Sequence, residues 1–284
     1  MSRVALVTGG SSGIGEAFAG IFAAEGFDLV ITARREERLR TVQARLQEQH
    51  GVRVEVIAAD LSQRETPARL CAEIAARGLT IDALVNNAGY GQYGAVEDVT
   101  LPEWRAQFEV NVFGAIRLLH AVLPTMRQAR RGTIVNVSSV AGKVTIPFAG
   151  PYCASKHALE AISDALRVEV APWKIRVVVV EPGPIATHFG ARTREVTARI
   201  LQSPGPYSDF YTNAERASEK EFQRGMRQPE LVARVIVRAI ESKRPKTRYR
   251  VAPMAKILVP LKGLASDRFL DRRLKRALRL PDSI

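Results

Sequence analysis

Short runs of apolar, mostly β-branched residues alternate along this chain with longer stretches of helical periodicity, and this alternation limits the fold more than any other feature. The runs predict strands at Val4–Thr8, Asp28–Ala33, 52–58, Ala83–Asn86, 133–137 and Ile175–Glu181, with a last candidate at 248–252. The helical segments include 36–49, 102–126, 152–170 and 229–242. Apolar strands separated by helices are typical of a parallel sheet covered on both faces. Right-handed crossovers then make it a doubly wound α/β sheet of about seven strands in a single domain.

The helical pattern weakens between residues 184 and 228, where glycines, prolines and several aromatic residues occur together. A long connection inside a compact domain is usually a functional lid or a mobile segment. We therefore expect residues 1–252 to form the main domain, with a substrate lid at 184–228. Residues 253–284 are expected to form a C-terminal extension.

The cysteine content and the hydropathy of the chain indicate its cellular location. The two cysteines, Cys71 and Cys153, are too few for a disulfide scaffold and suit a reducing compartment. The first strand begins at Val4 with no secretory leader before it. No apolar run approaches the roughly 18 residues of a membrane span. The sequence therefore predicts a cytoplasmic protein, with at most a peripheral membrane contact.

The formal net charge of +13 is unevenly distributed. Residues 243–284 hold 13 basic and 3 acidic side chains, so the rest of the chain carries a net charge of only +3. A nucleic-acid partner is therefore not expected, because its basic footprint would extend over the body of the protein. Residues 267–280 form a basic amphipathic segment with leucines on one helical face. Such a helix can lie on an anionic membrane, or pack its leucines on the body or on a partner subunit, which is the preferred reading.

A glycine-rich turn follows the first strand, with the sequence Thr-Gly-Gly-Ser-Ser-Gly-Ile-Gly at residues 8–15. Glycines there let the backbone turn tightly and approach a pyrophosphate at a helix N-terminus. The spacing differs from the Gly-x-Gly-x-x-Gly of the common dinucleotide fingerprint, and such a turn alone can be purely structural. The candidate cofactor residues are Gly9, Ser11, Ser12, Gly13, Ile14 and Gly15.

The end of the second strand indicates which dinucleotide the turn would bind. Where an NAD site carries an acidic residue for the ribose, this chain has Arg34 and Arg35. Two guanidinium groups can bind a 2′-phosphate bidentately. The alternative is that both are solvated residues at a helix start, where cations are mildly unfavourable. The pair favours NADP(H) over NAD(H).

Tyr152 and Lys156 lie four residues apart in a helical segment, so they share one face. A phenol has an ordinary pKa near 10, and lowering it to about 7 takes roughly 4 kcal/mol. A cation at about 4 Å supplies that order of energy at an effective dielectric constant near 20. The pair can therefore exchange a proton with an alcohol or carbonyl oxygen, although the pattern alone is common on protein surfaces.

Polar residues also occur next to an apolar strand and within an apolar helical segment. Ser138 and Ser139 follow the strand at 133–137, at the carboxyl edge where α/β sheets bind ligands. A hydroxyl there can hydrogen-bond a reacting oxygen, or it can simply form a turn. Asn111 lies in an apolar helical segment, where it can organise a buried water or be a satisfied core amide.

In order and spacing, these motifs resemble the short-chain dehydrogenase/reductase family over residues 3–187, and more loosely as far as 252. Further positions that match the family are Asp60, Leu61, Asn87, Ala88, Gly89, Pro182, Gly183, Ile185 and Thr187. The resemblance implies that these residues, together with Tyr152 and Lys156, contact the cofactor. The resemblance implies a Rossmann-type fold and hydride transfer between NADP(H) and a carbonyl or alcohol. Residues 151–161 and 181–187 are similar to the hydroxysteroid and retinol dehydrogenase branch.

The resemblance also implies a role for each member of the catalytic set. Tyr152 would be the acid/base, and Lys156 would lower its pKa and hold the nicotinamide ribose. Ser139, 13 residues before the tyrosine, would orient the substrate. Asn111 would anchor a water that links Lys156 to solvent. Family members commonly assemble through the helices that correspond to 102–126 and 152–170, which implies a homodimer or homotetramer.

The expected substrate lining is largely apolar, which favours a hydrophobic ketone, aldehyde or secondary alcohol. Its candidate residues are Tyr90, Tyr93, Ser139, Phe148, His188 and Phe189, His188 being also readable as a solvated loop residue. The other histidines show no metal-ligand spacing, so no metal is expected. The competing function is a non-catalytic dinucleotide sensor or scaffold on the same fold, and the presence of all four catalytic residue types argues against it.

Overall fold

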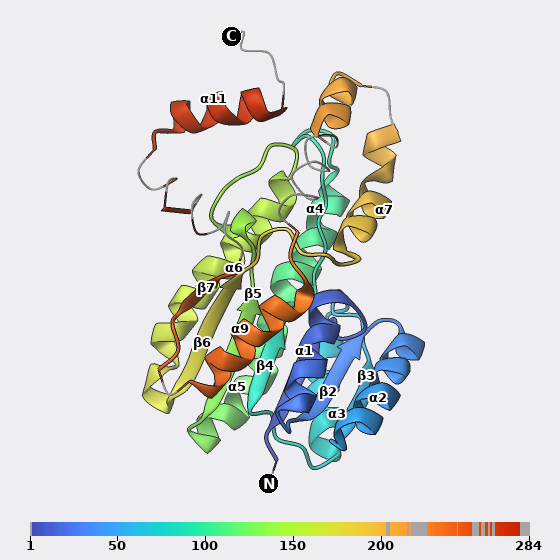
Figure 1. The fold of residues 1–284 in the computed structure, drawn as a ribbon, viewed down its shortest axis with the longest axis vertical. Coiled ribbons are helices and arrows are strands. Elements are labelled where there is room, and N and C mark those ends of the chain that lie inside the picture. Colours follow the sequence, from blue (N-terminus) through green and yellow to red (C-terminus); the bar gives the residue numbers. More distant parts are fainter. Residues whose placement is uncertain are drawn as a thin grey trace.

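A parallel sheet forms the centre of the computed structural model, which describes residues 2–202, 205–214, 216, 226–242, 244–251, 256, 259, 260, 262 and 265–278. Within these residues, seven strands pair in parallel in the order β3-β2-β1-β4-β5-β6-β7 (Figure 1). The strands are β1 (Val4–Thr8), β2 (Asp28–Ala33), β3 (Val54–Ala58), β4 (Ala83–Asn86), β5 (Gly132–Val137), β6 (Ile175–Glu181) and β7 (Arg248–Arg250). The predicted single-domain, doubly wound sheet of the Rossmann type is confirmed.

Helices cover both faces of the sheet (Figure 1). They are α1 (Gly13–Ala24), α2 (Glu36–His50), α3 (Thr66–Ala76), α4 (Leu101–Phe108), α5 (Gly114–Ala129), α6 (Gly150–Glu169), α7 (Phe189–Gln202), α9 (Pro229–Glu241) and α11 (Asp267–Leu278). One face is packed by α1, α2 and α9, and the other by α3, α5 and α6. Because all strands are parallel, their carboxyl ends meet at one edge, where ligands bind in such folds.

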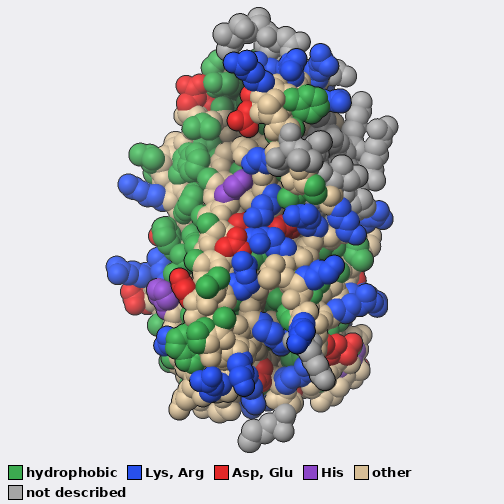
Figure 2. Space-filling view, turned by 90° about the vertical axis from the view of Figure 1, so that its left-hand side faces the viewer, with side chains coloured by type: hydrophobic (Ala, Val, Ile, Leu, Met, Phe, Trp, Pro, Cys, Tyr) green, Lys and Arg blue, Asp and Glu red, His purple; other side chains and the backbone are tan. Residues whose placement is uncertain are grey.

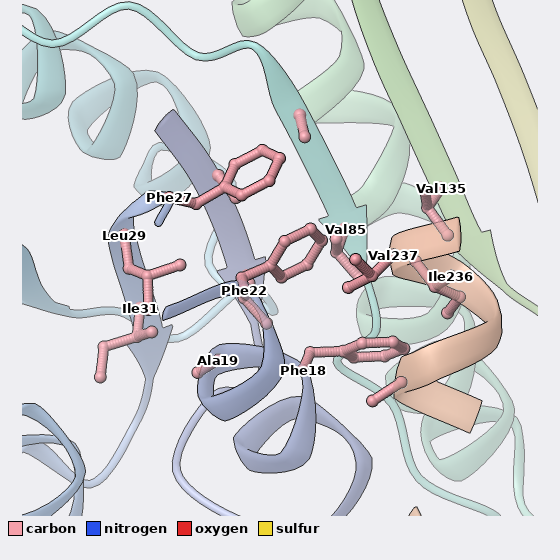
Figure 3. Close-up of a cluster of buried hydrophobic side chains, with 14 of the residues drawn as sticks. Phe18, Ala19, Phe22, Phe27, Leu29, Ile31, Val85, Val135, Ile236 and Val237 are labelled. Atoms are coloured by element: carbon pink, nitrogen blue, oxygen red, sulfur yellow. The ribbon is translucent and has the colours of Figure 1, made fainter. Parts of the chain in front are cut away.

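The core follows the alternation of side chains along the buried strands. In β1, Ala5 and Val7 face one layer, while Val4 and Leu6 face the other. In the first layer, aromatic residues of α1 meet apolar residues of the late helix α9, as Figure 3 shows for Phe18 and Val237. Helices far apart in sequence thus close one face of the sheet together.

Element boundaries differ from the sequence-based expectations at three places. The strand expected at 52–58 begins at Val54, because Gly51 takes a left-handed conformation (φ 66°) to end α2. The helix expected at 102–126 is interrupted by a π-helical turn, Glu109–Phe113, and α5 then runs to Ala129. A helix, α7, occupies part of the stretch expected to be an irregular lid, and residues 208–214 are also helical.

Parts of two expectations fall outside the described residues. In the expected lid these are 203, 204, 215 and 217–225, which include Phe222. Ala252, the last residue of the expected strand at 248–252, also falls outside, as does much of 253–284. Within the described part of the tail, Val259 packs with Val140 and Val144.

Basic side chains are frequent on the face that presents the β7 edge of the sheet, where Lys and Arg outnumber Asp and Glu (Figure 2). The helix α11 lies at the same end of the molecule as α7 (Figure 1). Its residues Leu270 and Leu274 are half-buried, and Phe269 is exposed. No helix in the described ranges is both long enough and apolar enough to cross a bilayer.

The edge strand β7 is joined to the body by an ion-pair network. Arg248 Nε lies 3.1 Å from Glu160 Oε2 and 3.4 Å from Glu181 Oε1, and Arg248 also pairs with Asp164. Arg250 Nε lies 3.1 Å from Glu181 Oε2. Glu160 and Glu181 are almost completely buried, and burial, together with Glu160, raises the pKa of Glu181. The arginines therefore compensate two buried carboxylates.

Candidate active site

The glycine-rich turn between β1 and α1 is packed so closely that side chains at Gly9 and Gly15 would collide with the protein itself. Gly9 has a φ of +70°, and a Cβ atom on Gly15 would lie 2.2 Å from the carbonyl oxygen of Gly9. The Thr8 hydroxyl accepts hydrogen bonds of 2.9 Å from the backbone N–H groups of Asn87 and Ala88. The turn is therefore fixed against the loop that follows β4, and its residues Gly9, Ser12 and Gly13 remain partly exposed.

Three further contacts bring the expected cofactor residues to one edge of the sheet. A Cβ on Gly13 would lie 3.0 Å from Thr187 Cβ, so the loop after β6 meets the start of α1. A Cβ on Gly89 would lie 3.0 Å from Asn111 Oδ1 and 3.7 Å from Lys156 Nζ. The turn after β1 and the loops after β4 and β6 thus lie side by side, and the loop after β4 ends beside Lys156.

The other expected cofactor residues border these loops with differing exposure. Asp60 Oδ1 accepts hydrogen bonds from the backbone N–H and the hydroxyl of Ser62. Pro182 accepts a 3.0 Å hydrogen bond from Val140 N. Ser11, Leu61, Pro182 and Ile185 are buried, whereas Ser12, Ile14, Ala88 and Gly183 are half-buried.

Tyr152 lies in the first turn of α6, with Ser139 directly beside it. The two side chains are hydrogen-bonded to each other, and Ser139 Oγ accepts a 3.1 Å hydrogen bond from Ala141 N, which orients it. Tyr152 is 8% exposed. Burial raises its pKa to about 12, and the hydrogen bond from Ser139 opposes the rise. The expectation of a pKa near 7 is therefore not met, and the phenol holds its proton at neutral pH.

Lys156 is fixed beneath the tyrosine by the backbone of β5. Its Nζ donates a 2.8 Å hydrogen bond to the carbonyl oxygen of Val137 and lies 5.9 Å from the centroid of the Tyr152 ring. Burial lowers the pKa of Lys156 to about 8, against the attraction of Glu160. The lysine is therefore still mostly charged at neutral pH and lies close to the Tyr152 ring.

Asn111 occupies the π-helical turn between α4 and α5, a distortion that is frequent at functional sites. Its Nδ2 donates to the Tyr90 carbonyl oxygen (3.0 Å) and to Ser155 Oγ (3.1 Å), and its Oδ1 accepts from Tyr90 N (3.1 Å). A cavity of about 10 Å³ separates Asn111 from Lys156, near the lower limit for one water molecule. Both readings of Asn111, as a satisfied amide and beside a water-sized space, fit this geometry.

Tyr93 and Phe189 supply an apolar wall beside Tyr152. Their ring centroids lie 6.1 Å and 5.5 Å from that of Tyr152, in one cluster with Ala141, Ala149 and Cys153. Phe148, which has a φ of 63°, belongs to a neighbouring cluster and packs its ring 5.3 Å from Tyr211. These aromatic residues connect α6 with the lid.

Two of the expected substrate residues lie elsewhere. Tyr90 faces Arg192 of α7, whose guanidinium carbon is 5.9 Å from the centroid of the Tyr90 ring. His188 is exposed and borders a groove beside α1 together with Gly13 and Thr187. Neither residue belongs to the aromatic cluster at Tyr152.

Arg34 and Arg35 are exposed at the carboxyl end of β2, as expected. Burial and the neighbouring cations Arg38, Arg34 and Arg192 lower the pKa of Arg35. Sequence reasoning missed Arg192, because the stretch that carries it was read as an irregular lid. The only signal for it was the i, i+3 spacing of Arg192 and Glu195, which fits a helical ion pair.

The chain matches the family model described as "short chain dehydrogenase" over residues 3–197. The chain belongs to the short-chain dehydrogenase family. The turn suits the pyrophosphate of a nicotinamide dinucleotide, because the glycine at position 15 lets the backbone close tightly on Gly9 at the N-terminus of α1. In the described part of the chain, no three His, Cys, Asp or Glu residues are grouped so that they could hold a metal ion.

Curated relatives of this dehydrogenase include several reductases. The chain is 33% identical over 283 residues to an NADPH-dependent 3-dehydrocapnine reductase of Ornithobacterium rhinotracheale (95% of each protein). It is 33% identical over 256 residues to a 3-ketodihydrosphingosine reductase of Bacteroides thetaiotaomicron (90% of each). It is 35% identical over 271 residues to retinol dehydrogenase 8 of Bos taurus (92% of this chain, 85% of the relative), which agrees with the resemblance to the retinol dehydrogenase branch.

Solved structures show the same fold. A short-chain dehydrogenase from Streptomyces avermitilis superimposes with a TM-score of 0.79 at 32% identity, covering 100% of this chain and 99% of the other. A short-chain dehydrogenase/reductase from Burkholderia phymatum, in complex with NAD, superimposes with a TM-score of 0.81 at 27% identity and covers 95% of both chains. A nicotinamide dinucleotide is thus the cofactor of the family, and both NAD and NADPH occur among these relatives.

Proposed function

We propose that this dehydrogenase transfers a hydride between NADP(H) and a hydrophobic ketone, aldehyde or secondary alcohol, with Tyr152 as the acid/base. The observation that carries the proposal is the burial of Tyr152 together with Lys156, whose Nζ lies 5.9 Å from the centroid of the Tyr152 ring, with Ser139 lowering the pKa of the same phenol. The sheet brings these three residues from two elements to the edge where the expected cofactor residues lie.

The residues that would hold the cofactor are those of the turn after β1 and of the loops after β4 and β6. A bound nicotinamide dinucleotide supplies the hydride. The tight turn at Gly9 and Gly15 would receive the pyrophosphate, and the N-terminus of α1 would attract its charge. The family resemblance assigns Thr187 to the nicotinamide end, and in the structure it lies against Gly13 at the start of α1.

The residues of the chain would handle the proton. With its pKa raised to about 12, Tyr152 is protonated at neutral pH and can donate a proton to a carbonyl oxygen. The Ser139 hydroxyl would orient that oxygen and stabilise the phenolate that remains. The nearby positive charge of Lys156 would favour the same phenolate. This arrangement suits reduction of a carbonyl compound.

Preference for NADP(H) over NAD(H) is supported by Arg34 and Arg35 and by the NADPH-dependent relative. Guanidinium groups bind phosphate bidentately, whereas the carboxylate of an NAD site would repel a 2′-phosphate. An apolar substrate is supported by the cluster of Tyr93, Phe189 and Tyr152, and by relatives named as reductases of 3-dehydrocapnine and 3-ketodihydrosphingosine.

The proposal also covers the domain assignment, the oligomeric state and the cellular location of the protein. We assign residues 1–252 to the catalytic domain with its lid at 184–228, and 253–284 to an extension that packs on it, as Val259 does. A homodimer or homotetramer in the cytoplasm is expected, with no nucleic-acid partner. If truncation after residue 251 abolished binding to anionic vesicles, α11 would act as a peripheral membrane contact instead.

A screen of purified protein with NADPH and a panel of apolar ketones and aldehydes, followed at 340 nm, tests the proposal. Oxidation of NADPH that depends on the carbonyl compound is expected. Tight NADPH binding without turnover of any panel member would support a sensor or scaffold instead. The arrangement of Ser139, Tyr152 and Lys156 favours the enzyme, because a scaffold does not need a buried phenol and lysine at one edge.

A further inference from the structure

Gln107, in the last turn of α4, is a fully buried polar side chain that does not belong to the catalytic set. Its Oε1 accepts a hydrogen bond of 2.5 Å from the backbone N–H of Gln92, and its Nε2 donates one of 2.8 Å to the carbonyl oxygen of Tyr90. These two groups belong to the peptide bonds on either side of Gly91. The side chain of Gln107 therefore fixes the backbone at Gly91 from both directions.

The backbone at Gly91 lies directly against the apolar wall of the substrate site. A Cβ atom on Gly91 would lie 2.9 Å from Tyr93 Cε1 and 3.2 Å from Phe189 Cζ. The rings of these two residues pack 6.1 Å and 5.5 Å from the ring of Tyr152. The position of the backbone at Gly91 therefore determines where both rings lie beside the proposed acid/base.

Gln107 and Asn111 hold different parts of the loop that follows β4. Asn111 Oδ1 accepts a hydrogen bond from Tyr90 N and its Nδ2 donates one to Tyr90 O, so Tyr90 is held even without Gln107. The N–H of Gln92, by contrast, is held by Gln107. Loss of the Gln107 amide would therefore release the loop after Tyr90 and leave residues 87–89, which are expected to contact the cofactor, in place.

We propose that Gln107 is a positioning residue for the apolar substrate, because it fixes the backbone against which the rings of Tyr93 and Phe189 pack. It acts through the loop and not on the reacting atoms. The inference rests on the proposed function, since it concerns the same substrate site.

The chemistry of the side chain suggests the variant that tests this role. The amide of glutamine donates and accepts a hydrogen bond at the same time. Methionine is similar in length but lacks the donor and is only a weak acceptor. Q107M therefore removes both hydrogen bonds while filling most of the space, and leaves the buried N–H of Gln92 without its partner.

The first measurement needs no turnover. Hydrogen exchange of the backbone amides in a peptide that covers residues 89–94 is followed by mass spectrometry on the full chain, without cofactor or substrate. Exchange at Gln92 should be about tenfold faster in Q107M, the factor expected for loss of one buried hydrogen bond.

T133V is the matched control for both measurements. It keeps the shape of the side chain but removes a buried hydrogen bond of 2.7 Å from Arg176, at the amino end of β5 and so at the opposite edge of the sheet from the site. Exchange in residues 89–94 should remain at the wild-type rate in T133V.

The second measurement is steady-state kinetics with NADPH and apolar ketones. Q107M should raise KM for the ketone about tenfold, with kcat within about threefold and the dissociation constant for NADPH within about twofold of the wild-type values. T133V should change none of these constants by more than about twofold. G91A keeps both hydrogen bonds of Gln107 but places a Cβ against the two rings, so it should raise KM as Q107M does.

Two outcomes would overturn the inference. One is wild-type exchange of residues 89–94 in Q107M. The other is a Q107M protein with wild-type KM while G91A has a raised one, which would mean that the wall affects substrate binding but that Gln107 does not position it. Failure of the proposed function gives a different result: the wild type would turn over no ketone, whereas faster exchange in Q107M would still support the anchoring of the loop.

Discussion

The ammonium group of Lys156 is hydrogen-bonded to the carbonyl oxygen of Val137, at 2.8 Å, while its attraction to Tyr152 acts across the 5.9 Å to the centre of the ring. Lys156 therefore has a fixed position that depends on the last residue of β5 and not on the tyrosine. The ammonium group of Lys156 is buried, and this burial lowers its pKa. A lowered pKa can be detected in the pH dependence of the free energy of unfolding.

The free energy of unfolding should change with pH because the pKa of Lys156 differs between the folded and the unfolded chain. Burial lowers the pKa of Lys156 from its ordinary value of 10.5 to about 8. Between these values the unfolded chain binds a proton that the folded chain does not, so this group makes the folded state more stable as the pH rises from 8 to 10.5. K156M lacks the effect. Urea unfolding should therefore show the wild type gaining stability relative to K156M over this range, and a pH-independent difference would contradict the lowered pKa.

Replacing the phenol tests the acid/base assignment directly. Y152F removes the hydroxyl that bonds to Ser139 but keeps the ring packed against Tyr93 and Phe189. We expect kcat for carbonyl reduction to fall by about 10²–10⁴-fold, the usual contribution of a general acid. The dissociation constant for NADPH and the melting temperature should remain close to those of the wild type. Near wild-type turnover in Y152F would rule the assignment out.

The role of Ser139 can be separated from that of its neighbour. S139A should lower kcat/KM by about a hundredfold, as the loss of one donor to a reacting oxygen usually does. Ser138 is buried, and among the described residues no side chain or backbone group hydrogen-bonds its hydroxyl. S138A is therefore the matched control and should retain most of the activity. Equal losses in the two variants would point to a disturbed turn.

The proposed pyrophosphate site requires a tight turn, which depends on the absence of a side chain at Gly15. In G15A the new Cβ would meet the Gly9 carbonyl oxygen at 2.2 Å and Asn87 Nδ2 at 2.7 Å. The turn must shift, so we expect NADPH binding to weaken strongly and the melting temperature to fall. Gly20 lies on the same helix with its nearest neighbour at 4.0 Å. G20A should bind NADPH as the wild type does, and equal binding by G15A would contradict the assignment of the turn.

The ion pairs of β7 should contribute to stability, because two of their carboxylates are buried. R248A leaves Glu160 paired with Lys143 and Glu181 paired with Arg250, at 4% and 0% side-chain exposure of the two carboxylates. Removing one partner of a buried pair costs about 3–5 kcal/mol when the remaining charge is uncompensated, and because one cation remains for each carboxylate we expect denaturant unfolding to show a loss of up to about 3 kcal/mol. R45A, which breaks the partly exposed pair with Glu16, should cost at most about 1 kcal/mol. Similar losses for both variants would mean that the network contributes little.

Local patterns predicted those parts of the fold and site that depend on short segments. Strands such as Ile175–Glu181 are buried on both faces, so their apolar runs are nearly continuous in the sequence. Tyr152 and Lys156 lie on one face of α6 because they are four residues apart. Ser139 follows directly after β5, as the sequence predicted.

Contacts between distant segments could not be predicted in the same way. Arg192 of α7 lies over the ring of Tyr90, about 100 residues away in the sequence, and nothing in residues 184–228 indicates that contact. The raised pKa of Tyr152 has a similar origin, since the burial that causes it comes from the surrounding loops and helices. The π-helical turn at Glu109–Phe113 is a further example, because its sequence reads as ordinary helix.

The packing of α9 against α1 has a consequence for how the protein is made. Phe18 and Phe22 of α1 complete their burial against Val232, Ile236 and Val237, which the ribosome adds more than 200 residues later. The helix that begins at the phosphate-binding turn therefore cannot reach its final packing while the first half of the chain is being synthesised. Until residue 240 has left the ribosome, the nascent chain keeps an aromatic surface exposed, which chaperones would recognise.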